Sequence, residues 1–222
     1  MGKQIRALEQ FVAQKKKSLT AYHSYSPDEI FAYKGEALFS VLDFWQYAYS
    51  QLEGLADTLA EFFVAKALGI EKAENVNYWT AYDMAYRNKR IEVKSTRYVH
   101  TWNTHISKVR TFSIEPTNSD YWGSSKIGIN NGQKLSRQSE VYVFCLNSNM
   151  DIENSNPLKV DDWIFFVVPT FVINNYCKDN LGQKKISLNV VKRLSNGGVA
   201  YDALKAAVDT AIDKSDEYYN TL

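Results

Sequence analysis

Residues 163–168, Trp-Ile-Phe-Phe-Val-Val, are apolar at every position, and this run constrains the fold more than any other segment. A strand with one face in water alternates apolar and polar residues, whereas this one has no polar face. We therefore expect a strand covered on both sides, inside a sheet that carries a layer of structure on each face. Residues 140–146 are predicted to form a second buried strand, in which Cys145 is a reduced core thiol.

Helical periodicity predicts the layers around these strands. Ser26-Pro27-Asp28-Glu29 has the residues of a helix start, with Ser as the N-cap and Glu three positions later. Helices are predicted over residues 3–19, from 26 to 52 in one or two pieces, over 55–68 with Gly69 as the stop, and over 199–212. The period changes to two elsewhere, which predicts strands over residues 79–86, 91–96, 111–114 and 186–191.

This order of elements predicts an α/β protein with a mixed central sheet flanked by helices and an N-terminal helical segment. We expect residues 1–52 to form the helical segment and to pack on an α/β core of residues 53–222. The two parts together are expected to make one structural domain.

Charge and cysteine content exclude several classes of protein. The net charge of +1 is unlike that of a protein that coats polyanions, although it leaves room for a few basic residues that meet phosphate. Two scattered cysteines are too few for a disulfide framework or a zinc site. No signal peptide and no apolar run of about 18 residues is present, so we expect a cytoplasmic protein without a membrane segment.

The tripeptide Glu92-Val93-Lys94 lies on a predicted strand, where alternate side chains point the same way. Glu92 and Lys94 therefore share one face, and Val93 faces the core. By itself this pattern is better explained as a solvated face, because Glu and Lys are common residues and roughly one such tripeptide is expected by chance. Its neighbours in the sequence give it more weight.

Two further carboxylates are expected beside this strand. Asp83 precedes Glu92 by nine residues across a tight turn, and an even number of loop residues would place both on the same face. Glu61 comes from the preceding helix, and Asp57, one turn earlier, is interpreted as a solvated neighbour rather than an outer ligand. Carboxylates together with the carbonyl of Val93 suit Mg²⁺ or Mn²⁺, which prefer oxygen ligands. Beside them, a lysine can orient a water or neutralise charge on a phosphoryl group.

These residues, in the order helix, strand, turn, strand, resemble the centre of the PD-(D/E)xK, or restriction-endonuclease-like, nucleases. The segments Asp43-Phe44-Trp45, Leu59 to Ala65, Tyr82-Asp83-Met84, Ile91 to Ser95, Phe112-Ser113-Ile114 and Val141 to Phe144 further resemble a family of bacterial restriction-endonuclease-like proteins of unassigned biological role. The resemblance covers about residues 40–210. Tyr82 replaces the proline of the superfamily name, and His100 stands near the place where a glutamine often follows the E-x-K strand.

The resemblance implies a metal-dependent nuclease that hydrolyses phosphodiester bonds of DNA, in restriction, repair or defence. Glu61, Asp83, Glu92 and the Val93 carbonyl would hold Mg²⁺ or Mn²⁺, and Lys94 would assist the attacking water. Many nucleases of this type pair to cut two strands, so a homodimer is also an expectation.

Contacts with the nucleic acid are expected just after the E-x-K strand, from Ser95, Thr96, Arg97 and His100. A hydroxyl there is equally well explained by bonding at the strand end. For a histidine, a solvated position in the loop is the default interpretation. The basic residues that follow or lie in the hairpin turn are either phosphate contacts or solvated charges. They are Arg87, Lys89, Arg90, Lys108 and Arg110.

Two alternatives stay open from the sequence. The first is a module on the same fold that binds nucleic acid or a partner without cutting. The second is an interaction protein in which Glu92-Val93-Lys94 is fortuitous. Separation of Asp83 and Glu92 onto opposite faces of the sheet would favour the second.

Overall fold

The computed structural model describes residues 25–50, 52, 55–70, 82–99, 106, 110–117 and 136–221 of the 222-residue chain. The chain divides into two compact units, Met1–Gln51 and Leu52–Leu222. The helix predicted over residues 3–19, all three histidines, Lys108 and residues 118–135 lie outside the described residues. In the described part, no helix has the length and apolarity needed to cross a membrane.

The first unit contains a β-hairpin followed by a helix. Strand β1 (Ile30–Tyr33) pairs with β2 (Glu36–Ser40), and helix α2 spans Val41–Tyr49. Ser40 caps the helix, because its hydroxyl accepts from the Asp43 N–H at 3.1 Å while the Asp43 carboxylate accepts from the Ser40 N–H at 2.7 Å. The second half of the predicted helical stretch is therefore confirmed.

The helix predicted to start at Ser26 is wrong. The capping contacts expected there do form, since the Ser26 N–H donates to Glu29 Oε1 at 2.6 Å. These contacts close only a single turn, and the chain then continues as the extended strand β1. Lys34 and Gly35 then adopt positive φ values of 52° and 87°, which suit a hairpin turn and interrupt a helix. The aromatic and β-branched residues around that turn favour strands.

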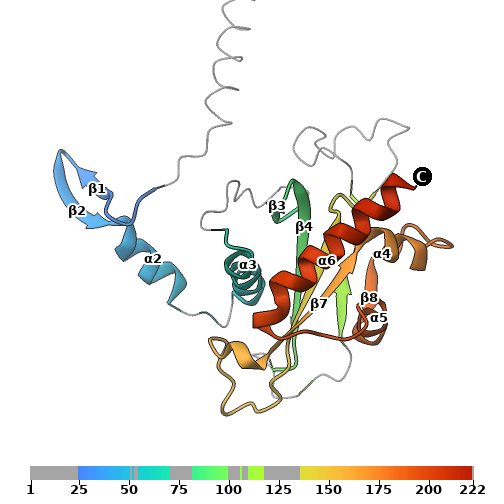
Figure 1. The fold of residues 1–222 in the computed structure, drawn as a ribbon. Helices are drawn as coiled ribbons and strands as arrows, with labels where there is room; N and C mark the ends of the chain where they lie inside the picture. The colour runs from blue at the N-terminus through green and yellow to red at the C-terminus, as the bar shows by residue number, and fades with distance from the viewer. Residues whose placement is uncertain are drawn as a thin grey trace, which may run out of the picture. The chain divides into compact units, whose positions relative to one another are not determined.

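The second unit is built on a four-stranded mixed sheet, which confirms the predicted fold class (Figure 1). Its order is β3 (Met84–Tyr86), β4 (Lys89–Arg97), β6 (Val141–Asn147) and β7 (Trp163–Pro169). Strands β4 and β6 are parallel, and the other neighbours are antiparallel. A separate pair is formed by β5 (Thr111–Ser113) and β8 (Lys185–Ser187).

The sheet is covered on both faces. Helices α3 (Ala56–Ala67) and α6 (Tyr201–Asn220) pack on one face, and α6 crosses the sheet in Figure 1. The β5–β8 pair, α4 (Thr170–Tyr176) and α5 (Leu188–Leu194) pack on the other face. A short 3-10 helix, η2 (Val160–Asp162), precedes β7.

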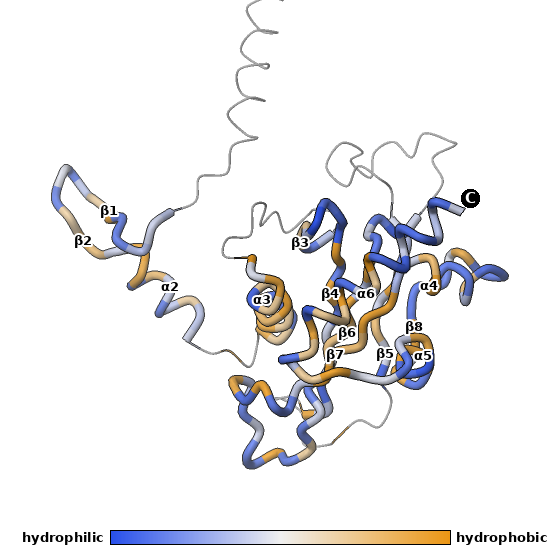
Figure 2. Tube along the Cα trace, in the orientation of Figure 1, coloured by the Kyte–Doolittle hydropathy of each residue, from blue (hydrophilic) through white to orange (hydrophobic). Residues whose placement is uncertain are grey.

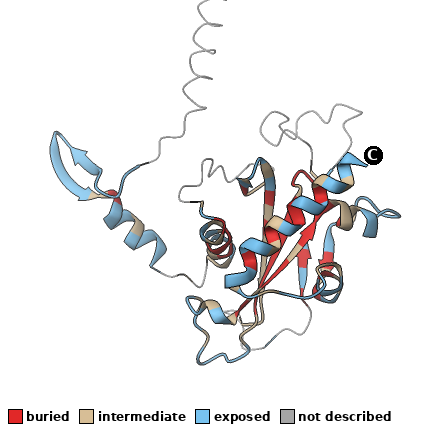
Figure 3. Ribbon diagram, in the orientation of Figure 1, coloured by how far each residue is buried: buried red, intermediate tan, exposed pale blue. Residues whose placement is uncertain are grey.

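The buried residues lie mainly on the central strands, which are red in Figure 3 and largely hydrophobic in Figure 2. Alternate residues of β6 and β7 point to the two faces of the sheet, and both sets are buried, as the apolar runs predicted. Toward α3 and α6 they are Val141, Val143, Cys145, Trp163 and Phe165, and toward β5, α4 and α5 they are Tyr142, Phe144, Leu146, Phe166 and Val168. Cys145 is a fully buried free thiol, as expected.

Two predicted elements differ from the structure. The strand expected over residues 186–191 ends at Ser187, whose hydroxyl accepts from the Val190 N–H at 3.4 Å and so caps α5. Burial of Leu188 and Val191 on one helix face outweighs the strand preference of the valines. The closing helix continues to Asn220, eight residues beyond its predicted end; its later turns bury Ser215 and pair Asp213 and Asp216 with the β3–β4 hairpin.

Candidate active site

The tight hairpin between β3 and β4 determines where Asp83 lies. Arg87 and Asn88 form a two-residue turn in which both have positive φ, 52° and 59°, as a type I′ turn requires. The regular pairing of the hairpin ends where Met84 meets Ile91. The Asp83 N–H then donates to the Ile91 carbonyl at 3.0 Å. Asp83 thus stands at the point where the two strands begin to separate.

The Asp83 side chain is held by the backbone of β4. Its Oδ2 accepts a hydrogen bond from the Val93 N–H at 2.6 Å. Burial raises the pKa of Asp83, while Lys94 and the Val93 N–H oppose the rise. The carboxylate is therefore fixed beside the E-x-K strand by a donor that belongs to the motif itself.

Glu92 and Lys94 share a face of β4 and form an ion pair between Oε1 and Nζ. The side chains are 15% and 31% exposed, so both charges are mostly withdrawn from water. Burial raises the pKa of Glu92, Asp83 raises it further, and Lys94 opposes the rise. For Lys94, burial lowers the pKa, but the carboxylates of Glu92 and Asp83 more than offset this and the net pKa is raised. The Lys94 side chain therefore stays protonated and positively charged.

Glu61 reaches the same group from α3. The helix packs on the sheet through Ala60, Phe63 and Val64, which leaves Glu61 half-buried at its margin. Burial raises the pKa of Glu61 to about 7, with Asp83 as the next cause. Three carboxylates from two elements therefore repel one another around a single ammonium.

A hydrogen bond ties α3 to β4 next to this group. The Ser95 hydroxyl donates to Asp57 Oδ1 at 2.5 Å. Asp57 is exposed, as a solvated neighbour should be, but it also holds the strand. The hydroxyl proton of Ser95 is thereby engaged within the protein, so a phosphate contact would have to replace this bond.

The donor set fits a hard divalent cation, because the ligating atoms of Glu61, Asp83 and Glu92 are all carboxylate oxygens. With Lys94 they carry a formal charge of −2 when ionised, which a divalent cation would neutralise. Among the described residues, no three His, Cys, Asp or Glu side chains are yet set as they would be around a metal ion. Lys94 engages Glu92, and the Val93 N–H engages Asp83.

Tyr142 is a neighbour of the site that sequence reasoning missed. It pairs with Glu92 in the parallel β4–β6 register and is 4% exposed. Burial raises the pKa of its phenol, and Glu92 raises it further. The pairing joins strands almost fifty residues apart in the sequence, so no local pattern reveals it.

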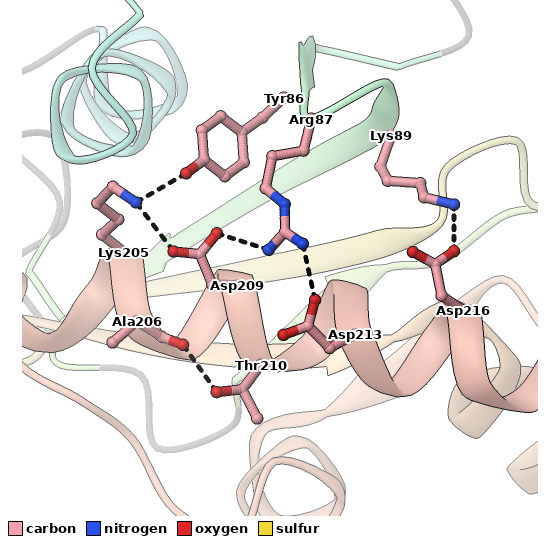
Figure 4. A network of polar contacts seen from close by, with 9 residues as sticks. All are labelled: Tyr86, Arg87, Lys89, Lys205, Ala206, Asp209, Thr210, Asp213 and Asp216. Carbon is pink, nitrogen blue, oxygen red and sulfur yellow. Dashed lines mark hydrogen bonds and ion pairs between the residues drawn. The ribbon is translucent and has the colours of Figure 1, made fainter.

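The basic residues of the hairpin turn are engaged within the protein. Arg87 donates to Asp209 at 3.0 Å and to Asp213 at 2.8 Å, and Lys89 pairs with Asp216 (Figure 4). All three acids lie on one side of α6. These cations are therefore paired within the protein, although the pairs remain partly exposed to solvent.

Among the described residues, Arg90 and Arg110 are also engaged within the protein. The Arg90 N–H donates to Glu140 Oε2 at 2.7 Å, and its guanidinium binds the same carboxylate. Arg110 is buried, donates to the Tyr98 carbonyl at 3.0 Å and stacks over the Tyr98 ring. Thr96 and Arg97 lie half-buried on β4, and Arg97 pairs with Asn147 in the ladder.

Fold and site together define an α/β protein with an acidic, lysine-containing centre at the end of a hairpin. Residues 53–184 match the family model of bacteriophage T4 endonuclease IV, and the match covers more than half of the chain. The chain therefore belongs to the bacteriophage T4 endonuclease IV family and is a nuclease. Neither a comparison with curated proteins nor one with solved structures returned a match. Glu61, Asp83, Glu92 and Lys94 all fall within the matched residues.

Proposed function

We propose that the chain is a metal-dependent DNA endonuclease of the PD-(D/E)xK type, with its active centre at Glu61, Asp83, Glu92 and Lys94. The observation that carries this proposal is the electrostatic interaction of three carboxylates with one partly buried ammonium, within the residues that match an endonuclease family. A role in restriction, repair or defence would follow from cutting DNA.

The carboxylates would hold Mg²⁺ or Mn²⁺, with the carbonyl of Val93 as a further oxygen donor. When bound, such an ion supplies a Lewis acid for the phosphoryl oxygens and acidifies a water. The protein supplies the geometry. The Val93 N–H orients Asp83, and α3 presents Glu61 from the side.

Lys94 is placed to act on the attacking water or on the phosphoryl group. Its raised pKa keeps the ammonium protonated, so its role is to donate hydrogen bonds and stabilise negative charge rather than to remove a proton. Loss of one such donor typically costs about 10²–10³ in rate. Substrate that displaces Glu92 from Lys94 would free both groups for these tasks.

The direct test is cleavage of plasmid and single-stranded DNA with Mg²⁺ or Mn²⁺. Wild type is compared with Glu92→Ala and Lys94→Ala, and Glu217→Ala and Lys214→Ala serve as controls because both residues are exposed on α6. We expect the first pair to lose activity and the second pair to keep it. Activity that survives both Glu92→Ala and Lys94→Ala would overturn the assignment.

Calorimetric titration with Mn²⁺ tests the metal separately. Binding to wild type that is lost in Glu92→Ala would support the centre as a metal site. A protein that binds DNA, takes up no metal and cuts nothing would instead be a binding module on the same fold.

A further inference from the structure

The near-neutral charge of the chain conceals a separation of charge. Residues 170–200 carry five cations and one acid, whereas α6 carries five carboxylates and two lysines. The two segments follow one another in the sequence but pack on opposite faces of the sheet. The segment 170–200 is therefore basic and α6 is acidic, although Asp209, Asp213 and Asp216 of α6 are paired with Arg87 and Lys89. The five cations are Lys178, Lys184, Lys185, Lys192 and Arg193, together called the basic face.

The basic face is available to a ligand. All five of its side chains belong to exposed residues. Within the described part of the chain, only Lys184 among them forms an ion pair, with Glu115 at 2.5 Å, and both partners of that pair are solvated. Arg193 lies over the Tyr176 ring, 6.0 Å from its centre, and keeps its charge toward water. The hairpin cations are different, because the acids of α6 neutralise them.

Two residues of the candidate active site, Glu92 and Lys94, point toward the same layer, whereas Glu61 comes from α3 on the opposite face. Glu92 pairs with Tyr142 and Lys94 with Phe144 across the parallel ladder, and paired residues point to the same face of the sheet. Tyr142 and Phe144 pack in the cluster that β5, β8, α4 and α5 cover. Glu92 and Lys94 thus face away from the acidic α6.

One end of the basic face is joined by hydrogen bonds to Arg137. The Ile114 N–H donates to the Lys184 carbonyl at 2.9 Å, and Arg137 Nε donates to the Ile114 carbonyl at 3.0 Å. Arg137 in turn is close enough to Tyr142 to oppose the rise of the Tyr142 pKa. Lys184 and Lys185 are therefore linked, through buried Ile114 and Arg137, to strands β4 and β6, the pair that carries Glu92.

We propose that the basic face binds the sugar–phosphate backbone of the DNA that the candidate active site cuts. This inference rests on the proposed function for its substrate. Phosphates attract exposed cations and release counterions, so binding through this face is expected to weaken steeply with salt. On the opposite layer, Arg87, Lys89 and Lys205 are paired with carboxylates of α6 and are therefore less available to phosphate.

The test is the affinity for fluorescein-labelled DNA of about 20 nucleotides, single-stranded and duplex, measured by anisotropy in EDTA to prevent cleavage. The double variant Lys185→Ala/Lys192→Ala is compared with Lys159→Ala/Lys214→Ala, which removes the same charge from exposed residues outside the face. We expect the first to weaken binding roughly tenfold and to lower the salt slope by about 1.5. The control should bind like wild type, and both should keep the wild-type melting temperature.

Equal losses in the two double variants, or wild-type affinity in Lys185→Ala/Lys192→Ala, would overturn the proposal. So would wild-type protein that binds neither form of DNA. Failure of the proposed function looks different, because DNA binding would then depend on the basic face while no metal-dependent cleavage occurs. Cleavage that requires Glu92 but not the basic face would sink this inference alone.

Discussion

The Ser95 hydroxyl donates to the Asp57 carboxylate at 2.5 Å and so joins β4 to α3 at the candidate active site. Ser95 directly follows Lys94, and Asp57 lies one turn before Glu61. The bond therefore sets the helix that supplies one carboxylate against the strand that supplies the ammonium. A shift of α3 would change the distances from Glu61 to the other charges.

Ser95→Ala is expected to lower the metal-dependent cleavage rate roughly tenfold, since small misplacements of catalytic groups are costly. The free energy of unfolding should fall by no more than about 1 kcal/mol, because the bond is exposed. The concentration of Mg²⁺ needed for half-maximal rate should rise, and Ser95→Thr should restore it. Ser113→Ala, an exposed serine on β5, is the control.

Asp57→Ala separates two explanations of that result. If Ser95 positions α3, breaking the bond from the side of Asp57 gives the same loss of rate. If Ser95 instead touches phosphate, Asp57→Ala leaves the rate unchanged and the positioning role is wrong.

The hairpin and its charges could be predicted because the information is local. Asp83, Glu92 and Lys94 lie within twelve residues, and the alternation of strand residues with a two-residue turn places them together. Contacts between distant segments could not be predicted in this way. The later turns of α6 contact the hairpin through Asp213 and Asp216, which bind residues more than 120 positions earlier in the sequence.

The errors in the fold have a similar cause. The segment that begins at Ser26 has good capping residues, yet the later turn at Lys34 and Gly35 makes the chain form a hairpin instead of a helix. The valines after Ser187 favour a strand, yet burial of one helix face decides for α5. In both places a single-residue preference is weaker than the packing around it.

Gly198 approaches β7 so closely that a side chain would not fit. A Cβ there would lie 2.3 Å from Cγ2 of Ile164 and 2.7 Å from Cε1 of Phe166. Gly198→Ala should therefore lower the free energy of unfolding by about 1–3 kcal/mol, measured by urea denaturation. Gly182→Ala is the matched control, because its Cβ would meet only Asn180 Oδ1 at 3.7 Å. Coincident unfolding curves for the two variants would show that β7 moves away from the added Cβ without lowering the free energy of unfolding.

Arg87 is expected to act in stability and not in DNA binding. Arg87→Ala removes the contacts with Asp209 and Asp213 and should lower the melting temperature (Figure 4). The loss should shrink as salt rises from roughly 0.05 M to 0.5 M, because exposed ion pairs are screened. Its affinity for labelled DNA in EDTA should equal that of wild type. A weaker affinity would show instead that the hairpin turn contacts the nucleic acid.

Glu61→Gln is expected to stabilise the metal-free protein at pH 8 while it abolishes cleavage. Burial, followed by repulsion from Asp83, raises the pKa of Glu61 to about 7 in the folded state, above its usual value of 4.5. The folded protein then binds more protons than the unfolded chain, so stability falls as pH rises from about 4.5 to about 7. Gln carries no charge, so the variant avoids a penalty on the order of 1 kcal/mol once solvent screening is allowed for.

Thermal unfolding in EDTA at pH 5 and pH 8 measures this effect. The two proteins should melt together at the lower pH, where Glu61 is protonated in the folded state, and the variant should melt higher at pH 8. Mg²⁺ should then raise the melting temperature of wild type more than that of the variant, since only wild type offers the ion this carboxylate. Equal melting temperatures of wild type and Glu61→Gln at pH 8 without metal would mean that solvent screens Glu61 from the charge of Asp83. Such a result would remove it from the proposed centre.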